Sequence, residues 1–191
     1  MKQTAMDIEY GLTKGASASG TSAVARAMNG LAYWCSASGQ TVTAASATFG
    51  TSTGEAALNF ALAAQFQASP IDEPNFLLIS PYNKILLNRW TSTNTRWVSA
   101  GDKKLVATIG IYESSFGVIE VYISNILANT NGTQDLAVYG GNMDTLSIAW
   151  LRKPFSEPLA KTGDFTAFQV VAEGTLQVSN PYALFNIDLN H

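Results

Sequence analysis

The chain has 191 residues, a length that fits one globular domain with a substantial core. No apolar run approaches the roughly 20 residues that a membrane-spanning helix needs, and the first residues lack the apolar stretch of a secretory signal, so we expect no membrane partner. A net charge of -3 without any basic run argues against tight electrostatic binding to nucleic acid.

Charged residues make up only 13% of the chain, about half of the usual share near 25%. Much of the surface must therefore be neutral. Copies of the same protein can cover such a surface at a low desolvation cost, because burying unpaired charge is what makes association expensive. A domain that is merely rich in Ala and Ser is the alternative interpretation.

The sequence lacks the residue sets of the common catalytic and metal sites. Cys35 is the only cysteine and His191 the only histidine, which excludes an internal disulfide and a Cys/His zinc site. Lys161-Thr162-Gly163 matches one element of the serine β-lactamases, but no lysine here has Ser or Thr three residues before it. We therefore predict no enzyme activity, no catalytic residues, no cofactor and no metal.

The first third of the chain predicts helices and small-residue loops. Met6 to Lys14 favours a helix, Gly15 to Gly20 a loop, and Thr21 to Met28 a further turn or two of helix. From Cys35 to Thr53 the sequence is nearly all Ser, Thr, Ala and Gly, so we expect an exposed, mobile loop there.

The middle of the chain predicts two helices around one buried strand. Leu58, Leu62 and Phe66 form an apolar stripe on a helix from Glu55 to about Ala68. Phe76 to Ile79 is typical of a strand buried on both faces. Ser80 and Pro81 then predict the N-cap and first residue of a second helix, which carries Trp90 near its end.

The remainder predicts mostly antiparallel strands. Expected strands are Leu105 to Tyr112, Val118 to Ser124, Thr145 to Leu151, Phe165 to Ser179 and Tyr182 to Asp188, the first two forming a hairpin; expected turns are Asn129 to Gln134 and Gly140 to Asn142. In the strand from Phe165 to Ser179, alternation predicts one buried and one wet face. Helices mixed with antiparallel strands indicate the α+β class.

Five segments together resemble one large family of tailed-bacteriophage major capsid proteins. The first is Leu151 to Asp164, of which Arg152 to Asp164 is the most specific part, followed by Val171 to Asn180; the others are Asn29 to Ala32, Leu78 to Pro81 and Tyr112 to Gly117. The likeness covers nearly all of the chain, which would correspond to the C-terminal two-thirds of a family member.

The resemblance implies the Hong Kong-type capsid fold, which has a peripheral domain with a long spine helix and an axial domain. On that scheme residues 1–191 are a single capsid subunit core. Peripheral-type parts are expected at about 1–30 and 150–180, and axial-type parts at about 54–150 and 181–191. Relative to the family, the chain is expected to be truncated at the N-terminal arm, the extended loop and the start of the spine helix.

The resemblance also implies a function: a structural major capsid protein that self-assembles into the icosahedral shell enclosing the genome. Implied partners are copies of itself in pentamers and hexamers, scaffold and portal proteins, and packaged DNA in non-specific proximity. The implied location is the virion, after assembly in the host cytoplasm. Two alternatives stay open: an encapsulin-like compartment shell protein, and a carbohydrate-binding phage tail or spike module that uses the scattered aromatic residues.

One charged segment is the candidate contact between subunits. Arg152, Lys153, Glu157, Lys161 and Asp164 fall within thirteen residues of a chain that is otherwise sparing with charge. From the residues alone, a solvated turn is the competing interpretation. The resemblance implies a loop that reaches toward the junctions between capsomers, where Pro154 and Pro158 would stiffen it.

Overall fold

The computed structural model describes residues 2–21, 27–43, 49, 52–90, 110–127, 137–160, 163 and 167–188. Its contacts divide the chain into two units. The ribbon unit comprises Met1–Tyr33 with Leu146–Ser179, and the sheet unit comprises Trp34–Thr145 with Asn180–His191. The predicted turn from Asn129 to Gln134 lies outside the described residues.

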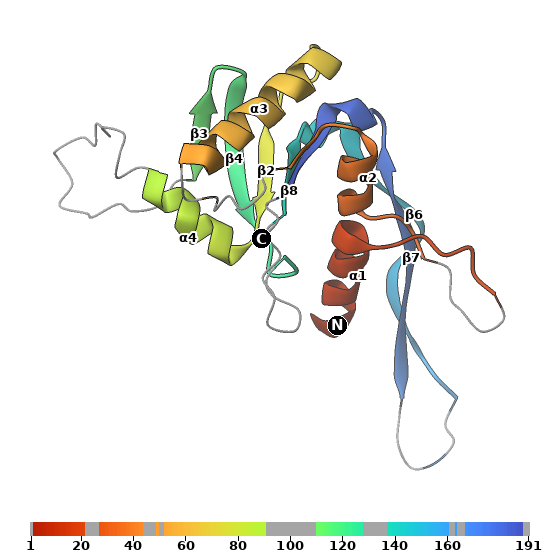
Figure 1. Ribbon diagram of the computed structural model, residues 1–191. Helices are drawn as coiled ribbons and strands as arrows, with labels where there is room; N and C mark the ends of the chain where they lie inside the picture. Colours follow the sequence, from red (N-terminus) through yellow and green to blue (C-terminus); the bar gives the residue numbers. More distant parts are fainter. Residues whose placement is uncertain are drawn as a thin grey trace. The chain divides into compact units, whose positions relative to one another are not determined.

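The described part of the ribbon unit is built mainly from a helix and a long hairpin. Helix α1 spans Lys2–Lys14, so the predicted helix is confirmed and begins four residues earlier. After it, Ala18 and Ala27 form an isolated antiparallel bridge. Residues 22–26, the middle of the helix predicted from Thr21 to Met28, lie outside the described residues. Strands β6 (Leu146–Pro158) and β7 (Phe168–Val178) pair antiparallel (Figure 1).

The sheet unit is built on a six-stranded mixed sheet in the order β1-β8-β5-β2-β4-β3. Its strands are β1 (Thr41–Thr43), β2 (Phe76–Ile79), β3 (Ile111–Ser114), β4 (Gly117–Ile123), β5 (Val138–Gly141) and β8 (Leu184–Asp188). A 3-10 turn, η1 (Met143–Thr145), follows β5, and a second, η2 (Pro181–Ala183), precedes β8. The predicted buried strand and the β3-β4 hairpin are confirmed. Of the strand predicted from Leu105, residues 105–109 lie outside the described part.

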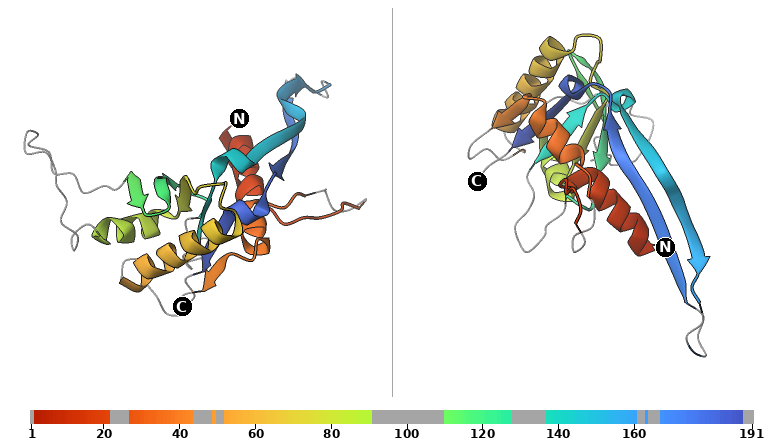
Figure 2. Two further views of the ribbon diagram at one scale, coloured as in Figure 1. Left: turned by 90° about the horizontal axis from the view of Figure 1, so that it is seen from above. Right: turned by 90° about the vertical axis from the view of Figure 1, so that its right-hand side faces the viewer.

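Helices α3 (Ser52–Ala68) and α4 (Pro81–Trp90) both cover one face of this sheet (Figures 1 and 2), and a short helix, α2, spans Leu31–Ala37. Leu58 and Leu62 of the predicted stripe are fully buried in the core, whereas Phe66 is 39% exposed. The Phe66 ring stacks on Phe116 of the β3-β4 turn instead. Helix α4 begins as predicted, because the Ser80 hydroxyl accepts the backbone N–H of Asn83.

The turn predicted at Gly140 to Asn142 is wrong in its first two residues, which belong to strand β5 in the middle of the sheet. A Cβ on Gly140 would lie 2.4 Å from Cζ of the Phe185 ring on the neighbouring strand. Gly141 has a φ of 144°, which L side chains rarely adopt. These glycines therefore serve close packing and an unusual backbone conformation.

The exposed loop predicted from Cys35 to Thr53 is wrong in part: most described residues from Ser36 to Thr43 are exposed as expected, but the segment contains regular structure and two buried apolar residues. Cys35 lies in helix α2 and is fully buried, residues 41–43 form the edge strand β1, and Phe49 is fully buried. The Phe49 ring packs against Trp90, and the Trp90 indole N–H donates to the Phe49 carbonyl at 2.6 Å. The buried side chains of Cys35 and Phe49 therefore anchor a segment whose composition is otherwise typical of a loop.

Within the described part of the chain, no helix has both the length and the apolar character that crossing a bilayer requires.

We expect Gly140→Ala to lower the unfolding free energy by about 1–3 kcal/mol, because the added methyl group meets the Phe185 ring in a packed core. Gly110→Ala is the matched control: a Cβ there meets nothing within 4 Å, so its effect should stay within about 0.5 kcal/mol. Urea unfolding of both variants measures the difference. Equal midpoints for the two variants would contradict this account of β5.

Burial raises the pKa of the Cys35 thiol above its ordinary value. The unfolded chain therefore loses this proton above about pH 8.5 while the folded chain keeps it, so the folding stability contributed by the thiol falls as pH rises. We expect a loss of up to about 1.4 kcal/mol per pH unit in that range. Cys35→Ala should remove this part of the slope, and urea titrations of both proteins between pH 8 and 10 test it.

Candidate assembly surface

The residues predicted as a charged loop lie largely in a strand. Strand β6 continues to Pro158, seven residues beyond the predicted end at Leu151, so Arg152, Lys153 and Glu157 are strand residues. The strand tolerates Pro154 and Pro158 because β6 pairs on one side only within the described residues, which leaves its outer edge free of ladder hydrogen bonds. Two register shifts, between Trp150 and Arg152 and between Arg152 and Phe155, absorb the irregularity.

The register places Arg152 and Glu157 on one face of the ribbon, which they share with Phe155. Arg152 is opposite Glu173, and its guanidinium donates from Nε and Nη2 to Oε2 of that carboxylate at 3.0 Å. Glu157 is opposite Gln169 and accepts its side-chain amide. Lys153 is exposed. The structure thus brings three of the five predicted residues together on β6, while Lys161 and Asp164 lie outside the described residues.

The other face of the ribbon is apolar, and the prediction that the β7 strand buries this face is wrong. The cross-strand pairs there are Ile148 with Leu176, Trp150 with Gly174, and Pro158 with Phe168. Phe168 is 66% exposed, and no residue of β7 is fully buried. The alternation was correct, but a lone two-stranded ribbon has too few neighbours to cover the face that the alternation creates.

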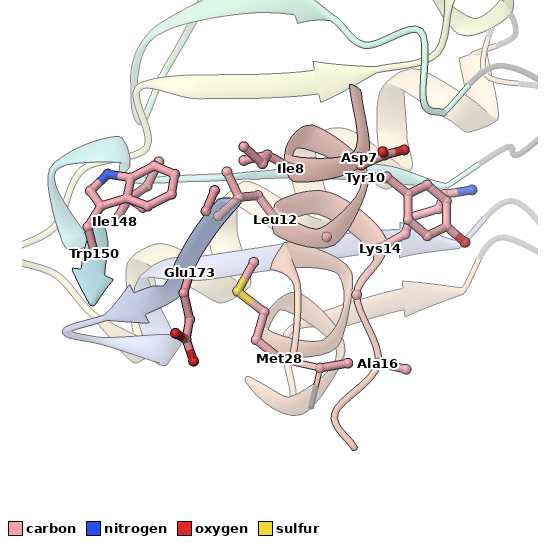
Figure 3. A pocket seen from close by; sticks show the side chains of 15 residues that line it. Asp7, Ile8, Tyr10, Leu12, Lys14, Ala16, Met28, Ile148, Trp150 and Glu173 are labelled. Carbon is pink, nitrogen blue, oxygen red and sulfur yellow. The ribbon is translucent and has the colours of Figure 1, made fainter. Parts of the chain in front are cut away.

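Two hollows lie between α1 and the ribbon. The larger, of about 580 Å³, is lined by apolar side chains of the helix, of the ribbon and of Met28, together with the charged residues Asp7, Lys14 and Glu173 (Figure 3). The Met28 sulfur accepts the backbone N–H of Leu176 at 3.3 Å, which occupies one donor on the free edge of β7. The second hollow, of about 430 Å³, adjoins Ile8 as well and reaches Phe155 and Val170 farther along the ribbon.

This apolar component was not predicted from the sequence. Exposed apolar side chains of the ribbon are Ile148, Leu151, Phe155, Leu159, Phe168 and Val170. The signal in the sequence that relates to them is the alternation of apolar and polar residues along β7. Within the described residues no cluster of three metal-ligating side chains occurs. The arrangement is that of a contact surface: a charged face, an apolar face and two open edges.

The sequence model of the family described as SU10 major capsid protein matches residues 1–189. The chain belongs to this family. No curated protein sequence matched it. The resemblance to tailed-phage major capsid proteins is therefore confirmed over almost the whole chain, and the family is one of structural capsid proteins.

Solved structures show the same fold at low sequence identity. The structure described as Mycobacterium phage Che8 matches with a TM-score of 0.50 and 12% identity, over 82% of this chain and 56% of its own. The holo-SrpI encapsulin complex from Synechococcus elongatus PCC 7942 matches with a TM-score of 0.51 and 14% identity, over 80% and 54%. The capsid protein spans about half the length of these chains. The predicted α+β, Hong Kong-type capsid fold is confirmed.

We expect Arg152→Ala to change the unfolding free energy of the capsid protein by no more than about 1 kcal/mol, because both partners of the Arg152–Glu173 pair are well exposed. Thermal unfolding measures this. The isosteric control Glu173→Gln should behave alike, since it removes the same ion pair. A loss of several kcal/mol in either variant would show that the pair holds the ribbon together.

Proposed function

We propose that this chain is the assembling core of a tailed-phage major capsid subunit, whose function is repeated contact with copies of itself in an icosahedral shell that encloses the genome. The observation that carries the proposal is the ribbon β6-β7. In the described part of the chain it pairs with no further strand, and large apolar side chains stay exposed along it.

A ribbon of this kind is poorly suited to a protein that works alone. Two strands are only marginally stable in water, and exposed apolar side chains with open strand edges favour association. The low charge of the chain lowers the desolvation cost of covering such a surface. Membership in a capsid protein family supports self-association as the use of the ribbon.

The finer features of the proposal follow from the same family. The ribbon unit corresponds to the peripheral-type part of the subunit, and the sheet unit to the axial-type part. Arg152, Lys153, Glu157, Lys161 and Asp164 contact a neighbouring subunit. The partners are further copies in pentamers and hexamers, together with scaffold and portal proteins and packaged DNA. The protein carries out no catalysis, assembles in the host cytoplasm and resides in the virion.

An encapsulin-like compartment shell is the second candidate, favoured by the fold match to the encapsulin complex. The capsid family match supports the phage shell over it. Purified particles separate the two: a phage shell encloses DNA after infection, and a compartment shell encloses a protein cargo.

Reversing Lys153 and Glu157 together in the complete gene product should prevent shell formation or leave only isolated capsomers. The same result is expected when Lys161 and Asp164 are reversed. Both changes should leave the melting temperature of the monomer nearly unchanged, because exposed charges contribute only about 0–1 kcal/mol to folding. Negative-stain images and light scattering give the readout. Lys153→Arg, which keeps the charge, should assemble normally, and normal shells from both double reversals would contradict the assignment.

A further inference from the structure

Within the described residues, the half of the sheet formed by β2, β4 and β3 leaves side chains exposed on the face opposite to α3 and α4. Strand register fixes which side chains share this face: Ile111 and Phe76 are both opposite Glu120, Tyr122 is opposite Leu78, and Val118 is opposite Glu113. Ile111, Val118 and Tyr122 are 59%, 56% and 41% exposed. This half of the face is therefore both apolar and acidic.

This face is hollowed. A cavity of about 390 Å³ is lined by Asn75, Phe76, Val118, Glu120, Tyr122, Met143 and Asp144. Two of these side chains are carboxylates, and none is basic. The Tyr122 hydroxyl donates to Oε2 of Glu120, and this bond and the carboxylate charge raise the pKa of Tyr122. The bond holds the Glu120 carboxylate in place at the cavity.

Helix α4 presents the complementary chemistry on the other side of the same unit. Its buried residues, Leu86, Leu87 and Trp90 among them, face the sheet. Tyr82, Ile85 and Arg89 are exposed, and their spacing of three and four residues puts them in one stripe on the outward side of the helix. The stripe is apolar with a cationic end. We call it the α4 stripe, and the cavity with its surroundings the acidic face.

We infer that the α4 stripe of one subunit docks on the acidic face of the next, with the Arg89 guanidinium entering the cavity beside Glu120 and Asp144. The partner is a second copy of this chain, and the inference rests on the proposed function because it assigns a surface to the contacts within a capsomer. Charge complementarity selects the occupant. A guanidinium forms strong charge-assisted hydrogen bonds with carboxylates, and arginine is enriched among the residues that anchor interfaces.

The placement of the two surfaces determines the kind of assembly. Two acidic faces repel each other, so a two-fold symmetric dimer through this face is disfavoured. Because the α4 stripe and the acidic face lie on opposite sides of one sheet, each copy can bind a neighbour on both sides. Such head-to-tail contacts close into a ring when the rotation between copies allows it. A ring of subunits is the form that a capsomer requires.

Charge reversals in the complete gene product test the inference. Arg89→Glu and Glu120→Arg should each lower the yield of capsomers and shells at least tenfold, as measured by sedimentation velocity and electron microscopy. A mixture of the two variants should restore six-membered capsomers, because only a ring with an even number of copies can alternate the two variants. In alternating copies, the carboxylate introduced at position 89 meets the guanidinium introduced at position 120, and the next contact keeps the native pair. Arg89→Lys, which keeps the charge, should assemble within about twofold of the unchanged protein.

The outcomes separate this inference from the proposed function. If the unchanged protein forms no oligomers, the proposed function itself fails. If the unchanged protein and both reversals assemble equally well, or the mixture of two assembly-defective variants yields no capsomers, the docking of Arg89 at the acidic face is wrong. Circular dichroism checks that each variant is folded. Asp144→Arg replaces Glu120→Arg if loss of the Tyr122 bond unfolds the latter, and its mixture with Arg89→Glu must then restore capsomers.

Discussion

The contact between Gly140 and the Phe185 ring supports the rest of the sheet unit. Phe185 is fully buried on the face of β8 that α3 covers, and its ring occupies the space that a side chain on β5 would otherwise take. This close approach lets the middle of the sheet present a continuous apolar face, with Leu77, Ile79 and Ile119 beside it. Both helices pack on that face, and their burial fixes which of their residues stay outside. The exposed stripe of α4 is therefore a consequence of how the sheet centre packs.

Periodicity and capping predicted the elements that carry their own local signal. The Ser80-Pro81 pair, the run from Phe76 to Ile79 and the stripe on α3 each depend on a few nearby residues, and each lies where expected apart from Phe66 at the end of the stripe. The glycines of β5 were mistaken for a turn because the reason for a missing side chain lies on a neighbouring strand, 45 residues away for the pair Gly140 and Phe185. The prediction that Phe49 and Cys35 are exposed was wrong for the same reason, since tertiary packing and not local composition decides their burial.

The candidate surface was predictable only in part for a related reason. Charge density pointed to Arg152, Lys153 and Glu157, but the predicted strand ended at Leu151, so these residues were expected in a loop stiffened by prolines. A proline is excluded from a strand interior only where its missing N–H would have a partner, and among the described residues β6 has no strand on its outer edge. The alternation in β7 was visible in the sequence. That its apolar face stays only partly covered was not, because alternation tells which side chains share a face and says nothing about what packs against it.

The two units differ in how much of their apolar surface they bury within one chain, and this difference fits a subunit that assembles. The sheet unit encloses its own core, with Leu58, Leu62, Leu77 and Leu87 fully buried inside one chain. The described part of the ribbon has no such core, since its two strands leave large side chains and both outer edges open. A subunit whose sheet unit has its own core can stay folded before assembly. The apolar surface that the ribbon leaves exposed supplies the free energy of association when another copy covers it. Stability of the monomer and affinity between copies thereby depend on different residues, so selection can change the contacts of the shell without unfolding the subunit that makes them.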